Sequence, residues 1–203
     1  QRLLNTVLYN YITPLSKSVD CGRWTGTVEL AEYSRNRLFS LFIFQEFFSF
    51  TSHLLVERRA LGSRAIVREN TYLCHVHIRP DGLAGVIITD NVYNSNVAFS
   101  MVLRVLDDFV RNEPNWQQIP NEAACTCAGL PGFLARCQNP VGGDAVVEPD
   151  VTRAHIVILN AIQNVLRQGE TLDNLIANSP MLSDQSKMFY RAATNLNRIC
   201  NIL

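Results

Sequence analysis

The last quarter of the chain carries an apolar stripe in which the spacing alternates between three and four residues. Eleven of its fourteen positions are apolar, and the exceptions are Gln168, Ser179 and Ser186. A repeat kept over six heptads exceeds what a helix packed on a small domain needs, so it predicts a coiled-coil seam within residues 150–197. A terminal helix folded on its own domain is the alternative. The apolar seam positions are Val151, Ala154, Ile158, Ala161, Val165, Leu172, Leu175, Leu182, Phe189, Ala193 and Leu196.

Residues 1–140 are predicted to form one α+β domain, in which helices are segregated around a run of antiparallel strands. Pro80-Asp81-Gly82 is a strong turn signal between two of those strands. Residues 141–149 contain two glycines and a proline, which predict a linker. Strands are expected at residues 3–12, 27–33, 63–69, 72–79 and 83–89, and helices at 39–61, 95–111 and 130–137.

The helix expected over residues 39–61 is unusually aromatic, and Gly62 is expected to end it. One stripe of this helix, which includes Phe47, suits packing against the sheet. Phe50 and Leu54 lie along the flank of that stripe, where a helix covering one sheet needs no apolar residue. Together with Phe47, these residues indicate either a wide core face or a groove that receives another apolar partner. The terminal segment of the same chain, or a lipid attached to it, would fit such a groove.

Composition and motifs argue against several classes of protein. The 18 basic and 18 acidic residues cancel, whereas a nucleic-acid-binding face needs an excess of basic residues. The longest mostly apolar stretch, residues 38–50, is too short and too polar to cross a bilayer about 30 Å thick. No signal peptide is visible, so the six cysteines are expected to be free thiols in a reducing compartment. No catalytic, metal or phosphate-loop motif is found, so neither an enzyme nor a bound cofactor is expected.

Cys74, His75 and His77 form a cluster that resembles a catalytic or metal site. Strand alternation places Cys74 on the inner face of its strand and the two histidines on the other face. Cys74 is then expected to be a buried apolar residue instead of a reactive thiolate. The histidines lack a nearby third ligand, so a solvated or helix-covered pair is expected.

The final four residues, Cys200-Asn201-Ile202-Leu203, match the C-a-a-X pattern of prenyltransferase substrates. Prenylation is therefore expected at Cys200, and Leu203 favours a geranylgeranyl group over a farnesyl group. A single lipid chain usually binds membranes reversibly. The pattern indicates a protein that works at a membrane surface and keeps a substantial cytosolic pool.

Short motifs from residue 45 onward carry a resemblance to a known family. They include Gln45-Glu46-Phe47, Tyr72-Leu73-Cys74-His75-Val76, Leu83-Ala84-Gly85-Val86-Ile87, Val105-Leu106-Asp107-Asp108-Phe109, Arg136-Cys137-Gln138-Asn139-Pro140 and Gln185-Ser186-Lys187. Through these motifs the chain resembles the prenylated longin SNAREs, synaptobrevin homologues of the YKT-six group. The match is poor before about residue 45.

This resemblance implies a longin domain of profilin-like fold, with a five-stranded antiparallel sheet flanked by helices, and a SNARE motif after it. It implies vesicle docking and fusion in ER–Golgi, endosomal, vacuolar or autophagic transport, through a bundle with three Q-type SNARE helices. It also implies a closed form in which the longin domain packs on its own SNARE motif. The expected location is the cytoplasm and the cytosolic face of Golgi, endosomal and vesicle membranes, reached through the lipid.

Three positions depart from the family pattern. Gln168 stands where the family has the arginine of the central bundle layer, and Arg167 lies off the seam. Pro180 lies inside the stripe and removes a helical hydrogen bond, so a break near Ser179 is expected in the free protein. Ile199 replaces a second cysteine that could carry another lipid. The first two departures also favour a second hypothesis, a regulatory longin scaffold that binds small GTPases or coat proteins without fusion activity.

Overall fold

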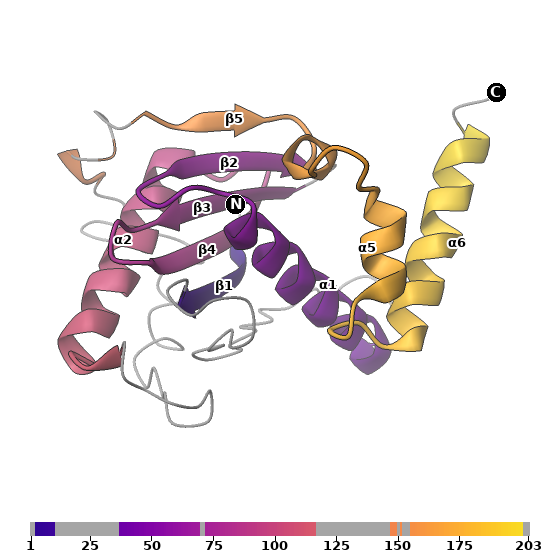
Figure 1. The fold of residues 1–203 in the computed structure, drawn as a ribbon, viewed down its shortest axis with the longest axis horizontal. Coiled ribbons are helices and arrows are strands. Elements are labelled where there is room, and N and C mark those ends of the chain that lie inside the picture. The colour runs from indigo at the N-terminus through magenta and orange to yellow at the C-terminus, as the bar shows by residue number, and fades with distance from the viewer. Residues whose placement is uncertain are drawn as a thin grey trace.

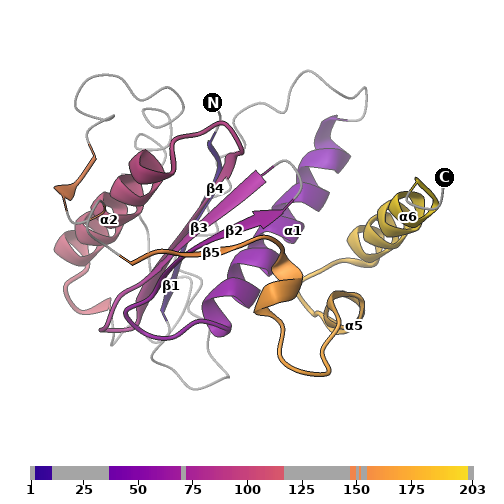
Figure 2. The same cartoon turned by 90° about the horizontal axis from the view of Figure 1, so that it is seen from above.

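A computed structural model describes residues 3–10, 37–69, 72–116, 147–149, 151 and 155–200. Five strands form one sheet: β1 (Leu3–Asn10), β2 (Arg64–Glu69), β3 (Tyr72–Ile78), β4 (Leu83–Asp90) and β5 (Val157–Leu159). They lie in the order β1-β4-β3-β2-β5 (Figure 1). Helix α1 (Arg37–Glu57) covers one face of the sheet and helix α2 (Ser95–Asn112) covers the other, as Figure 2 shows. This arrangement confirms the predicted α+β class.

Pairing in the sheet differs from the prediction at one edge. β1, β4, β3 and β2 pair antiparallel in turn, as predicted. The fifth described strand, β5, pairs parallel with β2 and comes from the stretch predicted to be coiled coil, so the described sheet is mixed instead of wholly antiparallel. The edge of β2 carries backbone groups that need partners, and an extended segment from elsewhere in the chain supplies them. The strand predicted at residues 27–33 lies outside the described residues.

The α2 face is specified by short-range signals. Gly82 has a φ of 90° in the predicted turn between β3 and β4. Asn94 caps α2, and its side chain accepts hydrogen bonds from two backbone N–H groups of the first turn. Gly85 allows α2 to approach β4 closely, because a Cβ there would lie 3.0 Å from Cγ1 of Val102. The buried core on this face consists of Leu83, Ile87, Tyr93, Val97, Ala98, Met101, Val102, Val105, Leu106, Phe109 and Trp116.

Helix α1 ends at Glu57, four residues earlier than the prediction of 39–61. The chain then turns over residues 60–63, where the N–H of Ser63 donates to the carbonyl of Ala60 and Gly62 has a φ of 73°. The glycine signal therefore marks the turn into β2 instead of the end of the helix.

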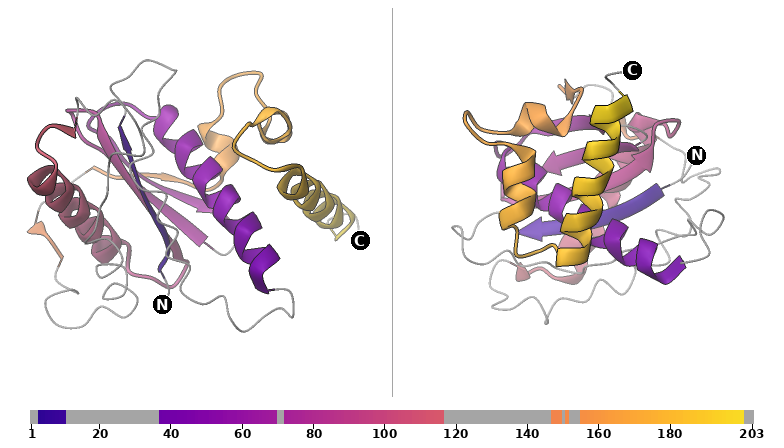
Figure 3. Two further views of the ribbon diagram at one scale, coloured as in Figure 1. Left: turned by 90° about the horizontal axis from the view of Figure 1, so that it is seen from below. Right: turned by 90° about the vertical axis from the view of Figure 1, so that its right-hand side faces the viewer.

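The stretch predicted as one helix is divided into several elements. After β5 come a 3-10 helix, η4 (Ile162–Val165), and then α5 (Leu172–Asn178) and α6 (Asp184–Cys200). A single helix does not form in this conformation, because side chains of the stretch pack against α1 and the sheet. The break predicted near Ser179 and Pro180 is confirmed, since α5 ends at Asn178. Figure 3 shows α5 and α6 side by side on the side of α1 that faces away from the sheet.

Some predicted segments lie outside the described residues. They are the helix at 130–137, most of the linker (residues 141–146) and the last three residues of the C-a-a-X pattern. Within the part of the chain that the structure describes, no helix is both long enough and apolar enough to cross a bilayer.

Candidate functional site

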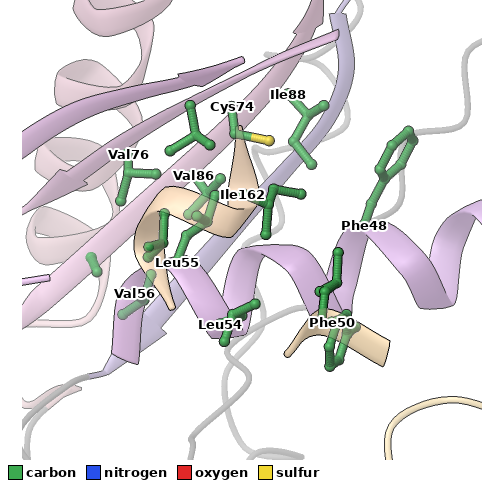
Figure 4. Close-up of a cluster of buried hydrophobic side chains, with 14 of the residues drawn as sticks. Phe48, Phe50, Leu54, Leu55, Val56, Cys74, Val76, Val86, Ile88 and Ile162 are labelled. Carbon is green, nitrogen blue, oxygen red and sulfur yellow. The ribbon is translucent and has the colours of Figure 1, made fainter. Parts of the chain in front are cut away.

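The side of α1 that faces away from the sheet is covered by the C-terminal segment (residues 155–200). Phe50 and Leu54 are only 7% and 4% exposed. Phe47 is partly buried, and its ring stacks on Tyr190 of α6 with the ring centroids 6.2 Å apart. We call these three residues the α1 flank. The chain's own C-terminal segment packs against them. Figure 4 shows part of the shared cluster, whose C-terminal members are Ile162, Val165, Leu172, Ile176 and Leu182.

Glu46 of α1 fixes the start of α6. Its Oε2 accepts hydrogen bonds from the backbone N and the Oγ of Ser183, both at 2.8 Å. Ser183 Oγ in turn accepts the N–H of Ser186 at 3.3 Å, so Ser183 caps α6. A carboxylate beside a helix N-terminus is also favoured by the helix dipole. Because Glu46 is only 5% exposed, loss of its charge would leave buried donors poorly satisfied.

Two further polar contacts join the domain to the stretch before α5. Arg58 Nη2 donates to Oε1 of Glu170 at 3.0 Å, and Oε2 of Glu170 accepts the N–H of Arg167 at 2.9 Å. The hydrogen bond from Arg167, together with the charge of Arg58, lowers the pKa of Glu170. Glu69, at the end of β2, accepts the N–H of Ile162 at 3.0 Å. Polar contacts therefore hold η4, the loop before α5 and the start of α6 to the domain.

The stripe residues are divided between buried and exposed positions. This division arises because each short element presents a different side to the domain. Val151, Val165, Leu172 and Leu182 are buried, Ala161 and Leu175 are half-buried, and Ile158, Gln168 and Phe189 are exposed. The side chains of Ala154, Ala193, Leu196 and Cys200 lie outside the described residues. The described part of the stripe thus forms no single apolar surface in this conformation.

Sequence reasoning missed several residues of this contact. Ile162 and Ile176 are each 1% exposed but lie off the predicted seam. Glu46 and Ser183 are 137 residues apart, so no local spacing links them. Ser183 alone carried a usable signal, because a serine directly before a helix is a typical cap.

Cys74 and His75 lie on opposite faces of the sheet, as predicted from strand alternation. Cys74 is buried in the cluster beneath α1, and burial raises the pKa of its thiol. His75 lies on the α2 face, with Nδ1 3.3 Å from the carbonyl of Ile87 and Nε2 3.1 Å from Oγ of Ser95. Burial lowers the pKa of His75 to about 4, so its imidazole is neutral at physiological pH. Among the described residues, no group of His, Cys, Asp and Glu is placed to hold a metal ion.

Comparison with known proteins places this chain in a family. Residues 30–129 match the Longin family, described as a regulated-SNARE-like domain. The synaptobrevin homologue YKT6 of Candida glabrata is 34% identical over 163 residues, which cover 78% of this chain and 80% of that protein. Its counterpart in Schizosaccharomyces pombe is 34% identical, with 77% and 81% covered, and that of Yarrowia lipolytica is 35% identical, with 77% and 80% covered. The chain therefore belongs to the YKT6 family of longin SNAREs, and its role is that of a SNARE in vesicle transport.

Proposed function

We propose that this SNARE mediates vesicle docking and fusion by forming a four-helix bundle with three Q-type SNARE helices, and that the closed conformation is its autoinhibited form. Burial of the seam layers in the bundle supplies the work of bringing two membranes together. The supporting observation is that Val165, Leu172 and Leu182, three predicted seam residues, are buried against the longin domain. The same side chains cannot occupy this cluster and the core of a bundle at the same time.

A change on the domain side tests this competition without altering the segment that enters the bundle. Glu46→Gln weakens the acceptor for Ser183. We expect faster assembly with Q-type SNARE helices, at an unchanged melting temperature of the finished complex. Asp108→Asn is the control, because Asp108 lies on α2 and pairs with its neighbour Arg111.

The assembly experiment separates the two hypotheses. Rapid assembly of the wild type, unchanged by Glu46→Gln, would exclude autoinhibition by this contact. Failure of every variant to assemble would exclude the bundle and favour the scaffold that binds small GTPases or coat proteins.

Gln168 is assigned to the central layer of the proposed bundle, and it is exposed in the closed form. A neutral amide can bond to three partner glutamines but lacks the charge-assisted hydrogen bonds of an arginine. Gln168→Arg should therefore raise the melting temperature of the complex and leave the stability of the free protein unchanged. A lower melting temperature of the complex would contradict the assignment of Gln168 to the central layer.

We further propose that, in a chain ending at Leu203, Cys200 carries a geranylgeranyl group and tethers the protein to the cytosolic face of Golgi, endosomal or vesicle membranes. One lipid chain makes this attachment reversible. Mass spectrometry of the cellular protein should find the group on Cys200, and Cys200→Ser should shift the protein to the cytosol. A Cys200→Ser protein that stays on membranes would contradict the proposal.

A further inference from the structure

Gly169 lies in the loop that joins η4 to α5, which Figure 2 shows, and its backbone adopts a left-handed conformation. Its φ is 85°, a value that glycine adopts freely and that residues with a Cβ disfavour. The N–H of Glu170 donates to the carbonyl of Arg167 at 3.0 Å, which closes a turn over residues 167–170. Gln168 and Gly169 are its two central residues. The chain therefore turns beside the residue assigned to the central layer of the proposed bundle.

The backbone sets the need for glycine at this position. Among the described residues, no atom outside the chain neighbours of Gly169 lies within 4 Å of the place that a Cβ would occupy. Residue 169 is also exposed. An alanine there would meet no steric obstacle from the rest of the described structure, so its effect would come from the value of φ.

Side-chain contacts hold this turn against the domain. One carboxylate oxygen of Glu170 accepts the N–H of Arg167 at 2.9 Å, and the other accepts the guanidinium of Arg58 at 3.0 Å. The side chain of Thr171 then caps α5. Gly169 therefore sets the direction in which the chain enters α5 after the turn.

The proposed bundle makes the opposite demand on residue 169. A continuous helix needs a negative φ of about −60° there. Glycine weakens the interior of a helix relative to alanine, because it loses more backbone freedom on folding. The bundle alone gives no reason for a glycine beside the central layer, whereas the turn of the closed form does.

We propose that Gly169 is the hinge of the C-terminal segment. Its left-handed φ holds the closed form, and a change in the sign of φ lets η4 and α5 join into one helix. This inference rests on the proposed function, since the bundle is what requires that helix. Gly169→Ala disfavours the turn and favours the helix, so both effects shift the population towards the open form.

Hydrogen exchange of the full chain tests the hinge without any partner helix. We expect Gly169→Ala to accelerate exchange about tenfold at the N–H groups of Glu170 and Ser183, in line with the cost of a left-handed alanine. Ser183 is the decisive position, because it lies at the start of α6 and bonds to Glu46. Gly169→Asn should have a smaller effect, because asparagine tolerates the left-handed region better than alanine does.

Gly62→Ala is the matched control. Gly62 also has a positive φ, 73°, and a Cβ there would make an ordinary contact at 3.9 Å with Cγ of Pro80. Because Gly62 lies in the turn before β2, its substitution should lower the free energy of unfolding of the domain and leave exchange at Ser183 unchanged. The proposal is overturned if Gly169→Ala leaves exchange at Ser183 unchanged, if it accelerates exchange at Glu170 alone, or if Gly62→Ala accelerates Ser183 equally.

Assembly with Q-type SNARE helices separates the hinge from the proposed function. Faster assembly of Gly169→Ala, with a higher melting temperature of its complex, supports both. Faster exchange at Ser183 with unchanged assembly supports the hinge and contradicts autoinhibition by the closed form. Unchanged exchange with normal assembly overturns the hinge and leaves the bundle in place.

Discussion

The two faces of the sheet are closed in different ways. On one face, α2 follows β4 almost directly in the chain, and buried apolar side chains such as Phe99 and Leu106 complete the packing. On the other face, Glu46 of α1 and Arg58, the residue after α1, contact residues of the C-terminal segment that lie 137 and 112 positions away in the sequence. That second face also depends on a buried carboxylate, Glu46, and on short elements instead of one long helix.

Under the proposed function, the α2 face is permanent, because it keeps its contacts, and the α1 face is exchangeable, because the C-terminal segment leaves it when the bundle forms. In the proposed function, residues of the α2 face keep the same partners throughout. Val165, Leu172 and Leu182 have two alternative sets of partners: the cluster that they share with α1, and the seam of the proposed bundle. Polar contacts suit the exchangeable face, because water can satisfy the same groups after release and their net contribution is only about 1 kcal/mol each.

The largest loss of stability should come from a substitution that creates a cavity in the core beneath α2. Leu106→Ala removes a fully buried side chain of α2 and should lower the free energy of unfolding by about 2–5 kcal/mol. Leu172→Ala on the exchangeable face should cost less, since the C-terminal segment can detach while the domain stays folded. Urea unfolding measures both values, and equal losses would remove the distinction between the faces.

Acid should act mainly on the permanent face, through His75. Its pKa is about 4 in the folded protein, below the usual 6.5, because burial disfavours the charged imidazole. The unfolded chain therefore binds more protons between these values, and stability is lost as pH falls from 6.5 towards 4. The shift corresponds to about 3 kcal/mol. His75→Asn should flatten this part of the urea-unfolding profile against pH, and an unchanged slope would contradict the assignment.

How much the sequence predicts also differs between the two faces. β2, β3, β4 and α2 match their expected bounds to within one residue at each end, because alternation, the turn and helical periodicity are local signals. The stripe predicts a coiled coil, whereas the closed form divides it at Pro180 and pairs part of it with β2. The pattern suits the proposed bundle, and contacts with α1 favour another arrangement of the same residues. Contacts between residues so far apart in the sequence produce no local pattern from which they could be predicted.

Ser183→Ala should have a moderate effect on the exchangeable face. It removes both the cap of α6 and a hydrogen bond to Glu46, at a cost of about 1–2 kcal/mol. Thr171→Ala is the control, because Thr171 is exposed and its side chain caps α5 by accepting the N–H of Asn174. Hydrogen exchange of α6 amides in Ser183→Ala should accelerate more than that of α5 amides in Thr171→Ala. Equal acceleration of the two helices would show that the bond to Glu46 contributes nothing.

Arg58→Gln should give the smallest effect, because the Arg58–Glu170 pair is partly open to solvent. We expect a slight increase in hydrogen exchange at Arg167, whose N–H bonds to Glu170, present at low salt and reduced at high salt by screening. An effect larger than that of Ser183→Ala would reverse the expected ranking of these two contacts.

The proposed function requires the C-terminal segment to leave α1 and to pack against Q-type SNARE helices. Spin labels at Leu61 and Met188, which are 51% and 68% exposed, report the distance between the turn after α1 and helix α6. We predict one well-defined distance in the free protein, and its replacement by a different or broad distribution when Q-type SNARE helices assemble with the chain. The same narrow distribution in the assembled complex, or a broad distribution in the free protein, would contradict this exchange.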